Sequence, residues 1–175
     1  GTLVATFKTA FANENVKVSH EMQPHILSNC FGISYQQFTF PKNTGLSGSI
    51  INGIAKGADE EAEAKVFMEL LMPQEAEVLA SYDHYNWKEY AAITKNHYRK
   101  GTAIYIGCMT DDNTLKAVLT EALNSAEVEI PEYSWPVIVR KGTNDLCKCV
   151  RYILNYSAEE QNVVYHGADG TELFS

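Results

Sequence analysis

Residues 90–126 read YAAITKNHYRKGTAIYIGCMTDDNTLKAVLTEALNSA, and this stretch decides the expected fold. Its first half predicts two strands, residues 90–98 and 102–108, joined by a tight turn in which Gly101 supplies a positive φ. Its second half predicts a helix over residues 113–126, with polar capping residues before it. Apolar side chains recur along this helix at a spacing of three to four, namely Leu115, Val118, Leu119, Ala122 and Leu123. The stretch therefore predicts two paired strands followed by a helix.

Upstream of this stretch the pattern is mostly that of strands. A short helix is predicted at residues 24–32, where Pro24 lies in the first turn and Gly32 marks the stop. Apolar and β-branched runs predict strands over residues 2–11, 33–40, 64–71 and 76–82. Residues 42–57 carry four glycines without a phosphate-loop motif, which predicts a mobile surface loop. The acidic residues that follow predict a solvated face, namely Asp59, Glu60, Glu61 and Glu63.

Downstream of the predicted helix the pattern changes to short strands. Residues 127–136 contain two prolines and predict a connector. Turn signals then separate three predicted strands, over residues 137–141, 147–155 and 161–166. The sequence therefore predicts two domains: residues 1–130, and a small antiparallel β module over residues 131–175.

The charge balance restricts the partners of the chain. Its 175 residues carry 14 Lys+Arg against 22 Asp+Glu, a net charge of −8. Phosphate binding requires clustered cations, so neither a nucleic acid nor a membrane surface is an expected partner, and neutral or sugar-like partners fit better. Residues 22–41 lack charged side chains but contain polar residues and Pro24, which argues against a membrane segment.

The cysteines and histidines predict no metal, cofactor or catalytic site. The alternating pattern around Cys147 and Cys149 predicts two small buried side chains on one face of a strand. Cys30 is expected to be a structural residue at a helix end. Neither Cys30 nor Cys108 has the flanking glycines of an amidotransferase nucleophile. The five histidines are scattered, without metal-ligand spacing.

An aromatic segment, residues 81–90, reads SYDHYNWKEY where a short polar turn would suffice. Its candidate contact residues are Tyr82, His84, Tyr85, Trp87 and Tyr90. Rings with polar tips are typical of protein interfaces, so these residues are expected to form part of an assembly surface. The same rings, with the polar groups beside them, could stack on a sugar, which gives a carbohydrate-binding module as the alternative. In a third interpretation, Tyr82 and Trp87 cover their own sheet.

Four motifs, in their order along the chain, resemble the C-terminal part of glycoside hydrolase family 42 β-galactosidases. Residues 2–7 (TLVATF) and 12–18 (ANENVKV) are similar to a strand and an x-D-E-N-x-x-V loop of that family's trimerisation domain. Residues 98–107 (YRKGTAIYIG) resemble its Y-G-x-G-x-A-x-Y-x-G hairpin. Residues 152–157 (YILNYS) resemble the F-L-L-N-H-S strand of its C-terminal β domain, with Tyr156 in place of the usual histidine.

The resemblance implies an α/β fold class. It implies a partial glutamine-amidotransferase-like (flavodoxin-like) domain that is β-rich and lacks its leading strands, followed by part of the C-terminal β domain. It implies a non-catalytic oligomerisation region, because the family's two catalytic carboxylates belong to an upstream barrel. The fragment itself is expected to be inactive, while the parent enzyme acts on galactosides. Self-association is expected, as a trimer in the intact family, although an exposed sheet edge would also permit a dimer of the fragment. The chain begins without Met, so we expect a fragment of a longer protein. No signal peptide is visible, which favours a cytoplasmic parent.

Overall fold

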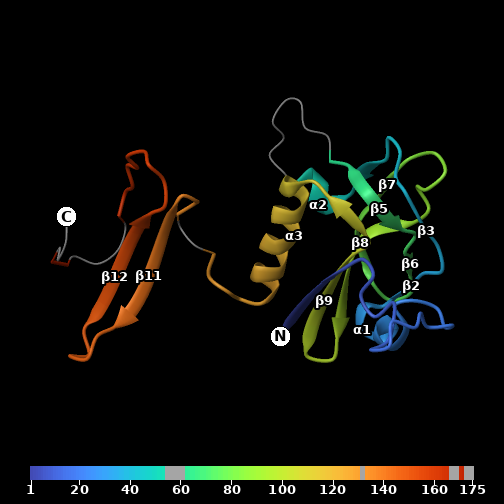
Figure 1. Cartoon of the computed structure of the whole chain (residues 1–175), viewed down its shortest axis with the longest axis horizontal. Coiled ribbons are helices and arrows are strands. Elements are labelled where there is room, and N and C mark those ends of the chain that lie inside the picture. The colour runs from blue at the N-terminus through green and yellow to red at the C-terminus, as the bar shows by residue number, and fades with distance from the viewer. Residues whose placement is uncertain (54–61, 131–132, 166–169, 172–175) are drawn as a thin grey trace. The chain divides into compact units, whose positions relative to one another are not determined.

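The computed structural model describes residues 1–53, 62–130, 133–165 and 170–171 (Figure 1). The chain divides into two units, Gly1–Glu129 and Ile130–Ser175. Most of the regular structure is β-sheet, and the longest helix is α3, Asp112–Ser125. Across the described ranges, no helix is both long and apolar enough to span a bilayer.

A five-stranded sheet with the order β1-β9-β8-β7-β4 forms the centre of the first unit. Its strands are β1 (Thr2–Thr6), β4 (Gly45–Ser47), β7 (Glu77–Asp83), β8 (Ala91–Tyr98) and β9 (Gly101–Ile106). Strand β1 runs parallel to β9, and the other neighbours pair antiparallel. The predicted hairpin of residues 90–108 is therefore confirmed as the pair β8–β9.

The turn of this hairpin differs from the prediction in one detail. The positive φ falls on Arg99, at 54°, and not on Gly101. A side chain at Gly101 is excluded for another reason: an added Cβ would lie 2.6 Å from the carbonyl oxygen of Gly1. Gly101 therefore allows β1 to approach β9 closely.

Two smaller sheets complete the unit. One has the order β10-β5-β3 and the other pairs β2 with β6. Their strands are β2 (Ile33–Ser34), β3 (Phe38–Thr39), β5 (Ala64–Glu69), β6 (Met72–Pro73) and β10 (Cys108–Thr110). The strand predicted for residues 33–40 is thus wrong as one element, because its two ends pair in different sheets. The strand predicted for residues 2–11 ends at Thr6, because Lys8 and Ala10 adopt left-handed backbone angles.

Helices connect and cover these strands. The helix predicted at residues 24–32 is present as η1 (His25–Leu27) and α1 (Ser28–Phe31), and Gly32 ends it at a φ of 62°. The loop predicted for residues 42–57 is wrong where it contains β4 and α2 (Ser49–Asn52), and its residues 54–57 lie outside the described ranges. Of the acidic face, Glu63 is exposed as expected, and Asp59, Glu60 and Glu61 lie outside those ranges.

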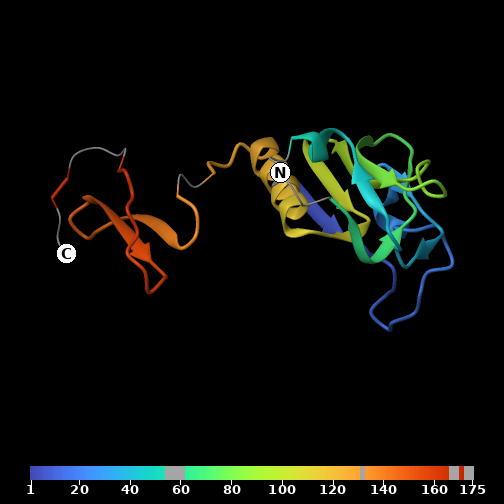
Figure 2. The same ribbon diagram turned by 90° about the horizontal axis from the view of Figure 1, so that it is seen from above.

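Helix α3 begins at a strong cap. The Asp111 carboxylate accepts hydrogen bonds from the Thr114 N–H at 2.9 Å and the Thr114 hydroxyl at 2.7 Å. Partial burial alone would raise the pKa of Asp111, but these bonds outweigh it and lower the pKa. The helix lies beside β1 (Figure 2). Its buried face differs from the predicted stripe, since Thr114, Val118 and Ala122 are buried while Leu115 and Leu119 are exposed.

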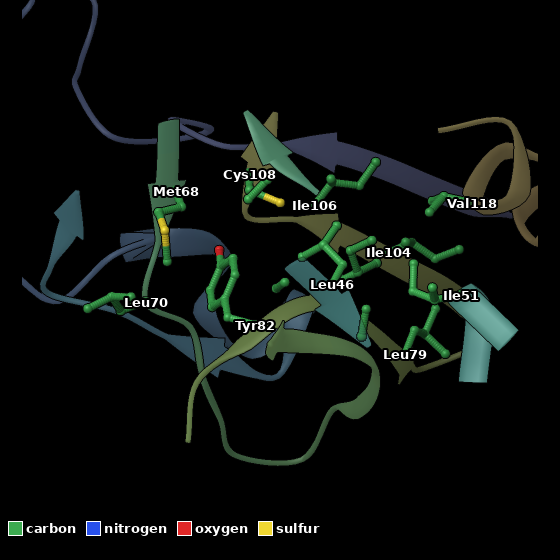
Figure 3. Close-up of a cluster of buried hydrophobic side chains, with 14 of the residues drawn as sticks. Leu46, Ile51, Met68, Leu70, Leu79, Tyr82, Ile104, Ile106, Cys108 and Val118 are labelled. Atoms are coloured by element: carbon green, nitrogen blue, oxygen red, sulfur yellow. The ribbon is translucent and has the colours of Figure 1, made fainter. Parts of the chain in front are cut away.

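Both faces of β9 are buried, which divides the core into two clusters. Ile104 and Ile106 point into the larger cluster, shown in Figure 3, and Ala103 and Tyr105 point into the smaller one. The larger cluster also includes Leu46, Ile51, Met68, Leu70, Leu79, Tyr82, Cys108 and Val118. The smaller one includes Phe31, Ile33, Tyr35, Leu71 and Ala91.

The described part of the second unit is a two-stranded antiparallel ribbon of β11 (Val137–Thr143) and β12 (Cys149–Asn155). The third predicted strand, residues 161–166, is wrong where it can be checked, because residues 161–165 form no strand. His166 lies outside the described ranges. The predicted burial of Cys147 and Cys149 is also wrong: both are exposed, because the described residues place no second layer over the ribbon.

Candidate functional site

The segment between β7 and β8 forms a turn held by its own hydrogen bonds. The N–H groups of Trp87 and Lys88 both donate to the carbonyl of His84 at 3.0 Å. The N–H of Asn86 donates to the His84 Nδ1 at 3.2 Å. Because Nδ1 accepts, the neutral His84 ring carries its proton on Nε2. These hydrogen bonds fix the backbone that carries the rings of the turn.

The rings of this turn stack on one another and face partly outward. The His84 ring lies 4.7 Å from Tyr85 and 6.2 Å from Trp87, nearly parallel to the indole at 19°. Tyr85 is 81% exposed, whereas Trp87 and Tyr90 are partly buried against the larger core cluster. We call residues 83–89 the aromatic turn. Its accessible rings are those of His84 and Tyr85, with part of Trp87.

Tyr82 does not belong to this surface. It is 1% exposed and lies in the core, where Figure 3 shows it among the other buried side chains. Its hydroxyl donates to the carbonyl of Glu69 at 2.7 Å, and burial raises its pKa well above the ordinary value. The prediction that Tyr82 contacts a partner or a sugar is therefore wrong, since a central strand turns it inward. The same contact role stays a prediction for His84, Tyr85, Trp87 and Tyr90.

A second aromatic surface was not predicted from the sequence. Five phenylalanines from three separate stretches form the phenylalanine patch: Phe7, Phe11, Phe38, Phe40 and Phe67. The Phe67 ring lies 5.2 Å from the rings of both Phe7 and Phe38, and Phe11 meets Phe38 edge-on at 6.0 Å. Phe38 is 46% exposed and Phe40 is 76% exposed. The alternation Phe38-Thr-Phe40 was the one local signal of this surface.

The ammonium group of Lys8 lies over this patch. Its Nζ is 3.4 Å from the ring centroid of Phe38, 3.7 Å from that of Phe11 and 4.8 Å from that of Phe67. An ammonium above aromatic faces is attracted by their negative quadrupoles. Burial lowers the pKa of Lys8, and Glu69 opposes this. No ion pair joins Lys8 to a carboxylate among the described residues.

A buried carboxylate holds the backbone of Lys8. The Glu69 Oε1 accepts from the Lys8 N–H at 2.8 Å, and the Oε2 accepts from the Tyr105 hydroxyl at 2.9 Å. Glu69 is fully buried, and burial raises its pKa against the effect of these hydrogen bonds. Glu69 thus joins β5, β9 and the turn after β1.

The raised pKa of Glu69 predicts a stability that falls as pH rises. The folded chain keeps the Glu69 proton to a higher pH than the unfolded chain, whose ordinary value is 4.5. The free energy of unfolding therefore decreases between pH 4.5 and the raised folded pKa. Glu69→Gln carries no titrating proton and should show a flatter profile in urea denaturation over this window. The lowered pKa of Asp111 changes the stability only below its ordinary value of 3.8, outside this window. Parallel stability profiles for the wild type and Glu69→Gln would contradict the prediction.

The other reactive groups offer no catalytic arrangement in the parts of the chain that are described. Cys108 is buried, and its pKa is raised to about 12 by that burial, which keeps the thiol from being a nucleophile. Cys30 is half-buried within α1, a structural position at a helix as predicted. His, Cys, Asp and Glu side chains of the described ranges form no group of three or more suited to a metal ion.

In a comparison with known protein families, residues 1–129 match the model of the β-galactosidase trimerisation domain. The chain is 29% identical over 133 residues to β-galactosidase BgaA of Clostridium cellulovorans, covering 76% of this chain and 19% of that protein. It is 26% identical to β-galactosidase Pbg of Clostridium perfringens, covering 99% of this chain and 26% of that protein.

Solved structures show the same fold. The cold-adapted β-galactosidase of Rahnella sp. R3 superposes with a TM-score of 0.73 and 23% identity, over 92% of this chain and 24% of that one. The β-galactosidase of Bacillus circulans sp. alkalophilus superposes with a TM-score of 0.72 and 22% identity, over 91% of this chain and 24% of that one. The chain therefore spans about a fifth to a quarter of the length of the proteins it matches.

Proposed function

The chain belongs to the β-galactosidase trimerisation domain family, and from that premise we propose that it holds copies of a β-galactosidase together without carrying the active site. The observation that carries this proposal is the family match over residues 1–129, which covers the whole first unit. The larger relatives are named β-galactosidases, so the proposed parent enzyme hydrolyses galactosides. The matched family is one of assembly and gives no support to the carbohydrate-binding alternative.

The surface of the first unit is suited to this role. Closed assemblies bury exposed aromatic side chains between subunits. Both the aromatic turn and the phenylalanine patch expose rings, and Tyr85 and Phe40 are their most exposed members. We therefore keep His84, Tyr85, Trp87 and Tyr90 as proposed contact residues and add the phenylalanine patch to them.

Two finer assignments belong to the same proposal. The parallel pair of β1 and β9, with α3 beside β1, supports a partial amidotransferase-like (flavodoxin-like) domain in residues 1–130. The ribbon of β11 and β12 supports assigning residues 131–175 to a partial C-terminal β domain.

Light scattering of the purified 175-residue chain tests the proposal. We expect a mass three times the 19.5 kDa of one chain. A monomer at all concentrations would overturn the assembly role, and a dimer would overturn the trimer. Galactoside hydrolysis by this chain alone would contradict a non-catalytic role.

A further inference from the structure

We propose that the trimer forms by docking the aromatic turn of one copy onto the phenylalanine patch of the next. This inference rests on the proposed function and names the two surfaces that meet. They belong to different elements: the aromatic turn joins β7 to β8, and the patch lies on β3, β5 and the segment after β1.

The symmetry of a trimer requires two different surfaces on each copy. A two-fold dimer joins one patch to itself, whereas a closed ring of three joins one surface of each subunit to a different surface of its neighbour. A ring built from this unit therefore needs two different surfaces that complement each other. The aromatic turn is a loop with Tyr85 almost fully exposed, and the patch is a broad cluster of rings.

The charges of the two surfaces are complementary. The patch carries the Lys8 ammonium, which makes no ion pair among the described residues, although the buried Glu69 attracts it electrostatically. The aromatic turn carries the exposed carboxylates of Asp83 and Glu89 beside the one cation of Lys88, and no ion pair within the described ranges occupies them. A carboxylate brought to Lys8 in a partly desolvated interface is worth more than an exposed ion pair.

Pairing of like surfaces is disfavoured by the same charges. Two phenylalanine patches facing each other would bring two Lys8 ammonium groups together. Two aromatic turns would bring Asp83 and Glu89 of both copies together. Like charges brought together in such an interface repel each other, which favours the mixed contact.

Cysteine cross-linking of the full chain tests this contact. Cys147→Ser and Cys149→Ser first remove the exposed thiols. One such chain then receives Phe40→Cys and another receives Tyr85→Cys. The two are mixed at a concentration at which light scattering shows the mixture to be trimeric, and are then oxidised with oxidised glutathione. A disulfide forms only where the two Cα atoms come within about 7 Å. We expect a disulfide-linked dimer in the mixture at about ten times the yield of either chain alone.

Matched controls separate this contact from random collision. Tyr98→Cys, on the partly exposed end of the β8–β9 hairpin, replaces Tyr85→Cys and should give only background. In the trimer, Tyr85→Ala should weaken association at least about tenfold, as for a central interface aromatic, while Tyr98→Ala should not.

The outcomes distinguish the inference from the function on which it rests. A monomeric wild-type chain overturns the assembly role itself. A trimeric wild type that gives no Phe40–Tyr85 link, links the Phe40→Cys chain to itself, or keeps its affinity with Tyr85→Ala overturns the docking inference alone. A link that forms only to another protein added as partner also overturns it.

Discussion

Replacement of Glu69 by alanine is expected to lower the free energy of unfolding by about 3 kcal/mol. The carboxylate accepts from two buried or partly buried donors, the Lys8 N–H at 2.8 Å and the Tyr105 hydroxyl at 2.9 Å. Each donor left without an acceptor costs about 1–3 kcal/mol, and the vacated volume adds to the loss. Urea denaturation monitored by the fluorescence of Trp87 and Trp135 measures the change.

Glu69→Gln is the matched control for this substitution. Its amide keeps the size of the side chain, offers an oxygen to the Lys8 N–H and leaves the rotatable Tyr105 hydroxyl able to accept from the amide nitrogen. We expect it to retain most of the stability that alanine loses. Equal losses for the two variants, or a loss below about 1 kcal/mol for alanine, would show that Glu69 does not hold this turn.

Local patterns predicted the elements whose neighbours in sequence are also their neighbours in space. The β8–β9 pairing, the position of α3 and the Gly32 helix stop were correct, because strand pairing across a short turn, a cap and a left-handed glycine act within a few residues. The residue with the positive φ in the turn and the buried face of α3 were not. The separation of β2 from β3 could not be predicted, because each end of residues 33–40 pairs with a distant strand: β2 with β6, and β3 with β5.

The candidate site shows the same division. The aromatic turn stands out within ten consecutive residues, so its composition was enough to identify it. Alternation along a strand could not tell that Tyr82 points into the core, since both faces of this sheet are covered. The phenylalanine patch depends on three distant stretches that meet and on the left-handed turn at Lys8. The alternation Phe38-Thr-Phe40 alone could predict neither.

Gly48 is the second position where a small change should have a large effect. It lies between β4 and α2 at a φ of 148°, in a segment that the sequence predicted to be a mobile loop. A Cβ at this position would lie 2.4 Å from the carbonyl oxygen of Leu79 and 2.8 Å from the Cα of Ala80. Both atoms belong to the backbone of β7, which pairs with β4 and β8 on its two sides and cannot move aside.

Gly48→Ala is therefore expected to lower the free energy of unfolding by more than about 3 kcal/mol, because backbone strain and steric overlap add. Gly53→Ala is the matched control at the other end of α2: its φ is −80°, and the nearest atom to an added Cβ is the Ile50 carbonyl oxygen at 3.7 Å. This control should stay within about 1 kcal/mol of the wild type. Urea denaturation of the two variants measures both values. If they proved equally stable, α2 would not be packed on β7, and Ile51 would not belong to the core that supports the first unit.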